Sequence, residues 1–381
     1  MRFLVLGGGL QGSACAFDLL GQDDVESVII ADLQPERPRA VSTDEHRLEL
    51  LEVDFADEAQ VRQAMEGRDV VLSAAPYTFN NDLARLAIES GCDYSDLGGN
   101  TEIVFQQLAM TDRAAETGCT IIPDMGLAPG LTNVLAAEAI RRLDSAADVR
   151  MYVGGLPENP LPPLNYQIVF SLEGAIDYLT TPSWILSEGR LKQREPLSDL
   201  ELLEFEGIGT LEAFHTAGGA STLPWRFENR VDYLAYKTLR YPGHAQIMTA
   251  IRDLGLLSDD PITVDQQEIV PRDVFIAAAT PQLIRPGEPD LVVLRVVAKG
   301  ERAGKPSVLT WNLVDREDPE TGITAMMRCT GFTLSIVGLL IGRGVIEKTG
   351  VLAPDEGIPY EPVVEELANR GVRIVFEETA G

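Results

Sequence analysis

A short glycine-rich segment near the start of the chain constrains its fold more than any other feature. Residues 7–12 read Gly-Gly-Gly-Leu-Gln-Gly and fit the pattern G-x-G-x-x-G. An apolar, strand-like run at residues 3–6 precedes the segment, and a helical pattern that reaches Leu20 follows it. Such glycines let the backbone turn tightly and approach a pyrophosphate, whose charge the helix N-terminus stabilises. The sequence therefore predicts a Rossmann unit that binds a dinucleotide.

The positions of this segment have separate predicted roles. Gly7 permits the tight turn, Gly9 brings the backbone against the pyrophosphate, and Gly12 lets the helix pack closely on the strand. Leu10 and Gln11 open the helix whose free N–H groups hold the phosphates, so we assign both to the same site. A glycine-rich turn without a ligand is the alternative interpretation, because glycine clusters are common in turns.

Asp32 favours NAD over NADP as the cofactor. It lies twenty residues after Gly12, at the end of the second predicted strand. A carboxylate at this position accepts hydrogen bonds from the adenosine ribose and repels a 2′-phosphate. Arg37 and Arg39 follow closely and would soften that preference.

The third and fourth predicted strands end at further candidates for cofactor contacts. Asp54 follows the third strand and is placed to approach the adenine. Ala74, Ala75 and Pro76 follow the fourth strand and would flank the cofactor. For both groups, simple termination of a strand is an equally good interpretation.

The chain is long enough for two domains. Its 381 residues, 45% of them hydrophobic, exceed what one core usually organises. In the first part, short apolar runs alternate with helical patterns, which is typical of a parallel sheet with crossover helices. We predict strands at residues 3–6, 27–31, 48–53, 70–74, 94–97 and 120–122. The helices between them are predicted to begin near Asp57, Asn81 and Asn100 and to end at Gly67, Gly91 and Gly118.

Longer strands follow a helix predicted over residues 131–143. They are predicted at residues 149–153, 166–170, 233–241, 291–297 and 308–314. A helix ending at Gly344, a helix over residues 362–371 and a strand over 372–376 are expected to pack back on the first domain. The predicted fold class is α/β: a doubly wound Rossmann domain and a second α+β domain on a mixed sheet. The Rossmann domain would comprise residues 1–125, completed by 326–381, and the second domain residues 126–325.

The acidic composition disfavours nucleic acids and membranes as partners. The formal net charge of −28 arises from 59 acidic and 31 basic side chains. Such a surface repels phosphate backbones and anionic lipids. A salt-rich environment is another explanation for the same composition. The longest apolar run, residues 333–341, is shorter than the roughly 20 residues of a membrane helix.

Cysteine usage and the N-terminus point to the cytoplasm. Cys15, Cys92, Cys119 and Cys329 are scattered and form no C-x-x-C pair, so we predict neither a disulfide framework nor a metal site. The N-terminus lacks the basic, apolar and small-residue regions of a signal peptide. We therefore expect a cytoplasmic protein with buried, reduced thiols.

Several motifs carry a resemblance to a known family. The segments are residues 7–12, 96–99 (DLGG), 123–130 (PDMGLAPG) with Asn133, 170–174 (FSLEG), 212–219 (EAFHTAGG), 237–244 (KTLRYPGH) and 340–346 (LIGRGVI). Together they resemble the saccharopine dehydrogenase-like family, and the later ones look most like its L-lysine 6-dehydrogenase branch. One position departs from the pattern, since Ala128 stands where saccharopine-type members often carry an acidic residue.

The resemblance implies NAD-dependent oxidative deamination of an amino acid, with the ε-amine of L-lysine as the expected substrate. The product would be a semialdehyde that cyclises to tetrahydropyridine carboxylate. A saccharopine-type or carboxynorspermidine-type dehydrogenase or reductase is the alternative within the family. A non-catalytic NAD-binding protein is the alternative of another class. By analogy, the apolar strands of the second domain would form the face of a homodimer.

Hydride loss from an amine requires a neutral nitrogen, so the protein must supply a proton acceptor. His215 and His244 are two of only three histidines, the third being His46, and histidine titrates near working pH. Lys237 is a further candidate for moving protons if it is desolvated. The alternative interpretation is that His215 and His244 are buried structural residues and that Lys237 is a surface charge.

The remaining candidates concern substrate charge. Lys237 and Arg240 lie three apart on a predicted strand and so face opposite sides of the sheet. Arg240 suits a carboxylate through bidentate hydrogen bonds, and Thr216 belongs to the same motifs. Glu173 and Asp96 are candidates to bind a substrate ammonium, and Asp96 is also a candidate for catalysis. Asp96 and Asp124 follow strands at the expected carboxyl end of the sheet, where open α/β proteins bind ligands, and a capping or turn role is an equally good interpretation of both.

Overall fold

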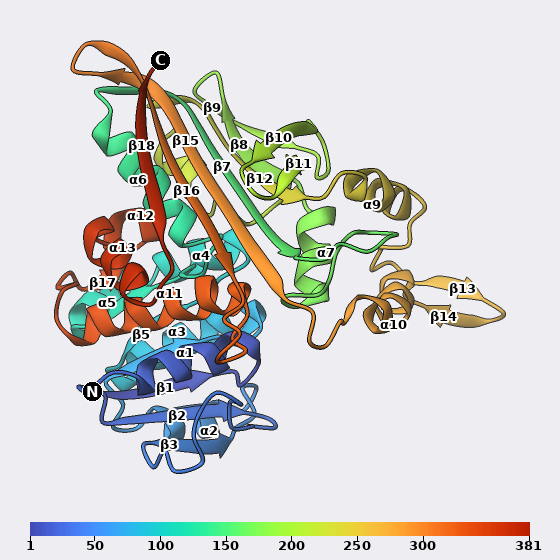
Figure 1. Cartoon of the computed structure of the whole chain (residues 1–381). Coiled ribbons are helices and arrows are strands. Elements are labelled where there is room, and N and C mark those ends of the chain that lie inside the picture. Colours follow the sequence, from blue (N-terminus) through green and yellow to red (C-terminus); the bar gives the residue numbers. More distant parts are fainter.

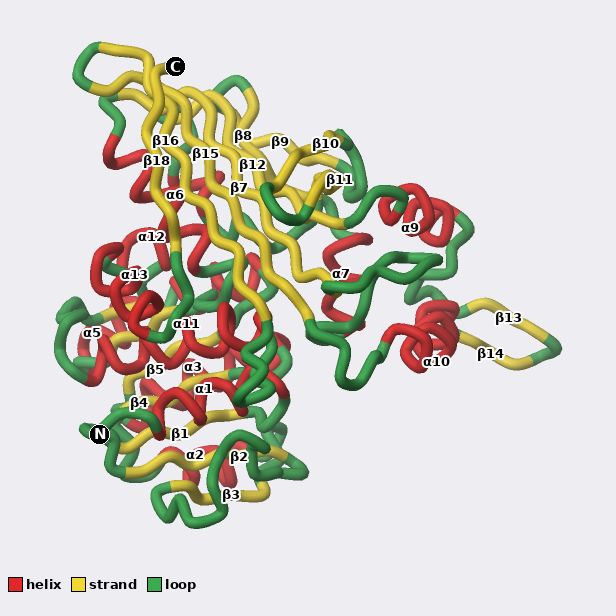
Figure 2. The backbone as a smooth tube through the Cα atoms, in the orientation of Figure 1, coloured by secondary structure: helices red, strands yellow, loops and turns green.

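The computed structural model describes residues 1–381 and contains two large β-sheets. In Figure 1 the parallel sheet of the N-terminal part lies below, and long strands of the second sheet rise above it. Figure 2 shows helices on both sides of the lower sheet, whereas strands dominate the upper part. The predicted α/β class, with a Rossmann sheet and a second domain on a mixed sheet, is confirmed.

The first sheet has seven parallel strands in the order β17-β6-β5-β4-β1-β2-β3. Their bounds are β1 Arg2–Leu6, β2 Ser27–Asp32, β3 Leu48–Glu52, β4 Val70–Ser73, β5 Asp93–Asp96, β6 Thr120–Ile122 and β17 Gly350–Val351. The strand order reverses between β1 and β4. In open α/β sheets, ligands bind outside the carboxyl ends of the strands at such a switch point.

Alternating apolar residues cover both faces of this sheet. Phe3 and Val5 of β1 point to one side, where α1 (Leu10–Leu20) packs against α11 (Ala325–Gly342). Leu4 and Leu6 point to the other side. The helices that follow the remaining strands are α2 Glu58–Met65, α3 Asn80–Ser90, α4 Thr101–Leu108 and α5 Thr111–Thr117. Burial on both faces explains why the central strands β1, β2 and β4 are mostly apolar, whereas β3 at the edge is largely exposed.

The second sheet has nine strands, with the main order β10-β11-β12-β7-β15-β16-β18 and with β8 and β9 attached to β12. It is mixed, because β12 runs parallel to β7 whereas the other pairs are antiparallel. The bounds are β7 Ser145–Pro157, β8 Ser183–Ser187, β9 Arg190–Arg194, β10 Glu201–Phe205, β11 Gly209–His215, β12 Val231–Arg240, β15 Asp290–Arg302, β16 Lys305–Arg316 and β18 Ile374–Ala380. Helix α6 (Leu131–Arg142) packs on β7 and β15.

Additional helices lie to one side of β11 and β12 in Figure 1. They are α7 Leu172–Thr180, α9 His244–Asp253 and α10 Pro271–Leu283, and a small hairpin of β13 (Ile262–Val264) and β14 (Gln267–Ile269) precedes α10. The remaining helices are α8 Leu223–Arg226, α12 Pro354–Gly357 and α13 Tyr360–Asn369. Apolar residues of α7, α9 and α10 form a separate cluster with Phe214 of β11.

Helix α11 is a core helix of this structure. Its 18 residues are long and apolar enough to pass a test for a membrane span, but 78% of them are buried inside the protein. Gly331 lies so close to α1 that a Cβ would be 2.7 Å from the Gln11 carbonyl oxygen. The apolar character of α11 is therefore explained by its packing between the first sheet and the second.

Three elements differ from the sequence prediction. The tail does not pack back as one unit, because β17 extends the first sheet whereas β18 pairs with β16 of the second. Residues 166–170 form no strand and instead run beside α10, where the Ile168 N–H bonds to the Leu283 carbonyl. The single helix predicted after Asn100 is two helices, α4 and α5, because Met110 leaves helical geometry.

Candidate active site

The glycine loop has the geometry that a dinucleotide requires. Gly7 has a φ of +96°, and a Cβ there would lie 2.7 Å from the Ala74 carbonyl oxygen. A Cβ on Gly12 would lie 1.8 Å from the Gly7 carbonyl oxygen, so this glycine is needed for helix α1 to meet the loop. A Cβ on Gly9 would meet nothing within 4 Å. Gly9 therefore faces open space at the N-terminus of α1, where a pyrophosphate would lie.

Asp32 closes the same loop from the end of β2. Its carboxylate accepts hydrogen bonds from the Gly8 N–H at 2.7 Å and from the Gln34 N–H at 3.1 Å. These bonds hold the carboxylate beside the glycines, and its oxygens retain further lone pairs for ribose hydroxyls. Of the nearby cations, Arg37 is engaged with the Ser42 carbonyl at 2.7 Å, whereas Arg39 is exposed.

The residues around the loop fit a bound dinucleotide. Gln11 lies in the first turn of α1, and both polar atoms of its side-chain amide are buried without a hydrogen-bond partner. Leu10 is 51% exposed beside it, so its side chain is available to a ligand at the same place. Ala74 and Ala75 are partly buried next to Gly7 across the switch point. The open Gly9, the orphaned amide and the exposed Leu10 form a surface that a cofactor would cover.

Two other predicted cofactor contacts lie at the margin of this surface. Pro76 is exposed after the end of β4. Asp54 is exposed, and its carboxylate accepts a hydrogen bond from the Ala56 N–H at 2.9 Å, which is a turn-forming role. The structure thus agrees with the alternative interpretation of Asp54, in which this residue ends a strand.

Asp96 and Asp124 lie together at the carboxyl ends of β5 and β6. Asp96 is completely buried and accepts hydrogen bonds from Gln107 Nε2 at 2.7 Å, the Gly98 N–H at 2.8 Å and the Asp124 N–H at 3.1 Å. Burial raises the pKa of Asp96, and these bonds oppose the rise. With its lone pairs used inside the protein, Asp96 organises the loop at residues 97–99 and the backbone of Asp124.

Asp124 is the titratable group with the clearest signs of a function. Its backbone adopts a left-handed φ of +60°, and the Gly98 Cβ position lies only 1.5 Å from its Oδ1. The carboxylate accepts hydrogen bonds from Ser221 Oγ and from the Gly99 N–H. Burial, with a smaller effect of the charge of Asp96, raises the pKa of Asp124 to about 7 although the Ser221 bond opposes it. A carboxyl group that titrates near neutrality suits proton transfer.

Tyr178 of α7 connects this sheet edge with the second domain. A Cβ added at Gly99 would lie 3.4 Å from the Tyr178 hydroxyl, and a Cβ added at Gly218 would lie 2.8 Å from the Tyr178 ring. Burial and then the carboxylate of Asp124 raise the pKa of Tyr178. A side chain at Gly218 would displace the ring, whereas Gly99 is needed for its backbone conformation, which has a φ of +124°.

A second contact crosses the same boundary. The Tyr77 hydroxyl, just after the end of β4, donates to Asp177 Oδ2 of α7 at 3.0 Å. Arg272 of α10 binds the other oxygen of Asp177 at 2.5 Å and forms an ion pair with Asp259 at 3.0 Å. The cofactor side of the first domain is thereby linked to the two helices that flank the cavity described next.

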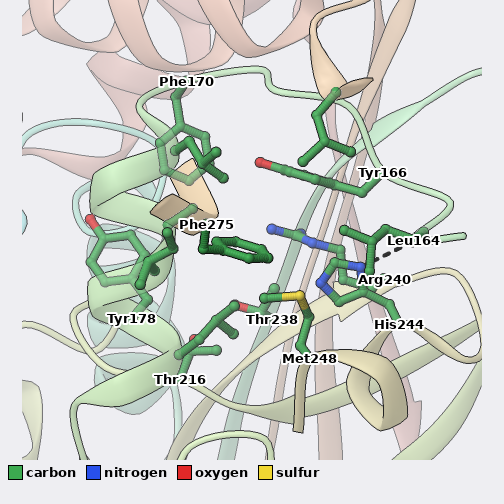
Figure 3. Close-up of a pocket in the computed structure, with 15 residues that line it drawn as sticks. Leu164, Tyr166, Phe170, Tyr178, Thr216, Thr238, Arg240, His244, Met248 and Phe275 are labelled. Carbon is green, nitrogen blue, oxygen red and sulfur yellow. Dashed lines mark hydrogen bonds between the residues drawn. The ribbon is translucent and has the colours of Figure 1, made fainter. Parts of the chain in front are cut away.

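A cavity of about 30 Å³ lies between β12 and the helices α7, α9 and α10. Its fifteen lining residues are mostly apolar, and Figure 3 shows aromatic rings around a central guanidinium. They are Leu164, Tyr166, Phe170, Leu172, Ala175, Ile176, Tyr178, Leu179, Thr216, Thr238, Arg240, His244, Met248, Phe275 and Leu283. Tyr178 belongs both to this wall and to the surroundings of Asp124, so the cavity adjoins the edge of the first sheet.

Arg240 supplies the positive charge of the cavity. It is 8% exposed, donates to the Leu239 carbonyl at 2.8 Å and lies 4.8 Å from the centre of the Tyr166 ring. No carboxylate of the protein pairs with it, in contrast to the buried Arg370, which binds Asp18 at 2.5 Å. A desolvated guanidinium without a counterion favours an anionic ligand.

His244 stands beside Arg240 at the first position of α9. Glu212 fixes this helix end by accepting hydrogen bonds from the Gly243 N–H at 2.9 Å and the Ala245 N–H at 2.6 Å. His244 Nδ1 lies 3.0 Å from the Leu164 carbonyl oxygen, which can only accept, so Nδ1 carries the proton. Burial and then the charge of Arg240 lower the pKa of His244 to about 3. The imidazole is therefore neutral at neutral pH.

The register of β11 and β12 separates the predicted site residues into two groups. Thr216, Thr238 and Arg240 line the cavity, and the two threonine hydroxyls lie 2.7 Å apart. His215 pairs with Lys237 across the strands, and both side chains point to the opposite face. The structure thus brings Arg240, Thr216 and His244 together, but it places His215 and Lys237 away from them. It agrees with the prediction that Lys237 and Arg240 face opposite sides.

The opposite face holds a local charge cluster. Lys237 Nζ forms an ion pair with Glu201 at 2.9 Å and donates to the Asp199 carbonyl. His215 is completely buried, with Nε2 3.4 Å from Asp199 Oδ2, and burial followed by the charge of Lys237 lowers its pKa to about 4. Glu173 is exposed on α7 and is not a lining residue of the cavity.

Three residues of the candidate site were not found from the sequence. They are Tyr178, Ser221 and Tyr166, which lie in loops or elements without a recognised motif. A weak signal was present, because Ser221 follows the glycines of residues 218–219 and Tyr178 follows the motif of residues 170–174 by a helical turn. Nothing in the sequence pairs Tyr166 with Arg240, because 74 positions separate them.

Comparisons with known proteins define the class and then the family. Residues 3–122 match the family model of the saccharopine dehydrogenase NADP binding domain, and residues 126–372 match that of the saccharopine dehydrogenase C-terminal domain. The protein is an NAD(P)-dependent oxidoreductase with a Rossmann domain. Because the second match alone spans more than half of the sequence, the chain belongs to the saccharopine dehydrogenase family.

The relatives are distant in sequence. Saccharopine dehydrogenase (NADP(+), L-glutamate-forming) of Schizosaccharomyces pombe is 22% identical, with 85% of this chain and 87% of that protein aligned. Carboxynorspermidine synthase of Vibrio alginolyticus is 24% identical, with 80% and 76% aligned. The structure of apo saccharopine dehydrogenase (L-Glu forming) from Saccharomyces cerevisiae superimposes with a TM-score of 0.81 at 20% identity, covering 100% of both chains. That likeness shows a shared fold.

Proposed function

We propose that this protein oxidises the C–N bond of a secondary amine that carries a carboxylate, or forms that bond in the reverse direction. One observation carries the proposal. Arg240, a buried guanidinium without a counterion, lies in a cavity that adjoins Asp124, a buried carboxyl whose pKa is near neutrality. The sequence motifs favoured the ε-amine of free lysine as the substrate. The relatives named above instead support a secondary amine, in which the nitrogen links two carbon chains.

The oxidative direction removes a hydride and a proton from the amine. The carbon beside nitrogen loses hydride and the nitrogen loses a proton, which leaves a C=N bond that water splits into a carbonyl compound and a free amine. The bound dinucleotide supplies the hydride acceptor in this direction. The protein must therefore hold the carboxylate, accept the proton and keep the substrate in one orientation.

We assign the proton acceptor to Asp124. Its carboxyl lies at the sheet edge where the cofactor's reactive end is expected, and its pKa of about 7 matches the operating pH. His244 is a weaker acceptor, because its pKa of about 3 leaves little driving force for taking a proton at neutrality. Ser221 and the Gly99 N–H position the carboxylate through their hydrogen bonds.

The cofactor preference remains part of the proposal. The family model and the aligned fungal saccharopine dehydrogenases carry NADP in their names. Asp32 nevertheless holds its carboxylate against the glycine loop, where it would repel a 2′-phosphate. We propose that this chain prefers NAD.

A single assay series tests the proposed function. Purified protein is incubated with NAD or NADP and with secondary amines such as saccharopine, with free lysine in parallel, while the absorbance of reduced nicotinamide is followed. In the reverse direction, reduced cofactor is supplied with an amine and a 2-oxo acid. Turnover of a secondary amine in either direction supports the proposal. Turnover of lysine alone would return the assignment to oxidative deamination of a primary amine.

A further inference from the structure

Arg240 is one of two groups in its cavity with donors free for a ligand: its guanidinium has no counterion, and its hydrogen bond to the Leu239 carbonyl leaves other N–H groups available. Tyr166, which is 6% exposed, forms the other: its hydroxyl is buried and meets no partner at hydrogen-bonding geometry. Its ring lies against the guanidinium, so both groups serve the same space, as Figure 3 shows. Two desolvated donors at one cavity fit the two oxygens of a carboxylate.

The size of the cavity fits such a group. A volume of about 30 Å³ is more than the roughly 10–15 Å³ that one water molecule needs. It leaves room for a group larger than one water molecule, such as a carboxylate. A chain attached to the carboxylate would lie along the cavity walls.

The cavity walls indicate the chemical character of the chain attached to the carboxylate. Eleven of the fifteen lining residues are hydrophobic, and none is Asp, Glu or Lys. Phe170, Leu172 and Phe275 are only partly buried, so they can move outward at less expense than core residues. A chain that enters between them exchanges water for aromatic and aliphatic surface.

Charged neighbours of the carboxylate are disfavoured by the same walls. An α-ammonium would find no acidic side chain and would lie near the positive charge of Arg240, which repels it. A second carboxylate would find no second cation, because His244 is neutral at the wall. The Thr216 and Thr238 hydroxyls already bond to each other.

We propose that the Arg240 cavity binds a carboxylate joined to an apolar aliphatic or aromatic chain, without a free ammonium and without a second carboxylate nearby. The substrate is then a secondary amine, one half of which derives from a hydrophobic amino acid or hydrophobic 2-oxo acid. Saccharopine, which carries three carboxylates and a free ammonium, does not match this cavity. The inference rests on the proposed function for the identity of the site, but its test does not require turnover.

The test measures binding of four small carboxylates to the full chain by calorimetry, with and without NAD. The apolar probes are 4-methylpentanoate and 3-phenylpropanoate, and the charged probes are glutarate and lysine. We expect the apolar probes to bind at least about tenfold more tightly than either charged probe. Equal or tighter binding of glutarate or lysine, or no binding of any probe, overturns the inference.

Variants test whether the carboxylate of the probes binds at Arg240. Arg240→Met should weaken binding of 3-phenylpropanoate by about tenfold or more, because it removes the charge-assisted hydrogen bonds to the carboxylate. Tyr166→Phe should weaken it less and should retain the preference for apolar probes. Arg316→Met is the matched control, since Arg316 is an exposed arginine at the C-terminal end of β16 that pairs with Glu158 and does not line the cavity. An equal loss in this control would show that the cavity does not hold the carboxylate.

The two proposals fail in different ways. If the apolar probes bind through Arg240 but no secondary amine reacts, the proposed reaction is wrong and the cavity assignment stands. If a secondary amine reacts but glutarate or lysine binds best, the reaction stands and the substrate class is wrong. In the assay with reduced cofactor, 4-methyl-2-oxopentanoate and phenylpyruvate should be used faster than 2-oxoglutarate.

Discussion

The dinucleotide loop and the Arg240 cavity are built in opposite ways. The loop consists of backbone from one continuous segment, and its contacts depend on the absence of side chains at Gly7 and Gly12. The cavity consists of side chains from several separate segments, and it holds a guanidinium without a counterion, that of Arg240, and a hydroxyl without a hydrogen-bond partner, that of Tyr166. The first region should therefore be sensitive to any added atom, whereas the second should be sensitive to a changed charge.

The largest expected effect concerns the glycines of the loop. In Gly12→Ala, the new Cβ would lie 1.8 Å from the Gly7 carbonyl oxygen, and neither backbone can move without shifting α1. We expect destabilisation of roughly 3 kcal/mol together with loss of cofactor binding. Thermal unfolding followed by circular dichroism measures the first, and titration with NAD measures the second.

Gly9→Val is the matched variant. Its side chain would project into open space, so the melting temperature should stay near that of the unaltered protein while cofactor binding is lost. If this variant unfolds as readily as Gly12→Ala, the distinction between a packing glycine and a binding glycine is wrong. Unaltered NAD affinity would show that the dinucleotide lies elsewhere.

Asp124→Asn should have the next largest effect. Loss of a general base typically lowers turnover by about 10²–10⁴-fold, and cofactor binding should change little. In the unaltered protein, activity should rise with pH through the pKa of about 7, because the carboxylate must be unprotonated to accept a proton. Ser221→Ala removes a bond that lowers this pKa, so it should move the rise to higher pH. A profile unchanged in both variants would exclude Asp124 as the base.

The same carboxyl should be visible in the stability of the protein. Its pKa in the folded state, about 7, lies above the ordinary value of 3.8, so folding favours the protonated form. This contribution is complete below pH 4 and is lost as the pH rises through about 7. Asp124→Asn should therefore unfold with a smaller dependence on pH across that window, which thermal scans at successive pH values measure.

The contrast between the regions also explains how far the sequence alone could lead. The glycine pattern and Asp32 lie within residues 7–32, and their spacing fixes their contacts. Strand alternation correctly predicted that Lys237 and Arg240 face opposite sides, but not which side holds the cavity. That depends on where α7, α9 and α10 pack, which no local pattern encodes. The proximity of Tyr178 to Asp124 likewise arises from the docking of two domains.

Asp32→Ala should have a smaller effect than the preceding changes. Removing one carboxylate from the glycine loop relieves repulsion of a 2′-phosphate and also removes a ribose contact. We expect the ratio of NADP to NAD affinity to rise by about tenfold, which corresponds to about 1.4 kcal/mol. Titration of each variant with both cofactors measures this ratio. Tighter binding of NADP by the unaltered protein would contradict the proposed preference.

The smallest effect on activity is expected for Lys237→Met, which sharpens the comparison between the two faces of β12. Methionine retains much of the buried side-chain volume but removes the ion pair with Glu201 and the bond to the Asp199 carbonyl. The free energy of unfolding should fall by about 1–3 kcal/mol, because a buried polar network loses a partner. The kcat should change by less than roughly tenfold, since a general-base role would give a larger loss.

His215→Asn should behave similarly, whereas Arg240→Met should chiefly raise the KM of the carboxylate substrate. If Lys237→Met or His215→Asn instead lowers kcat a hundredfold with an unchanged melting temperature, the proton acceptor lies on the face opposite the cavity, and the assignment to Asp124 is wrong.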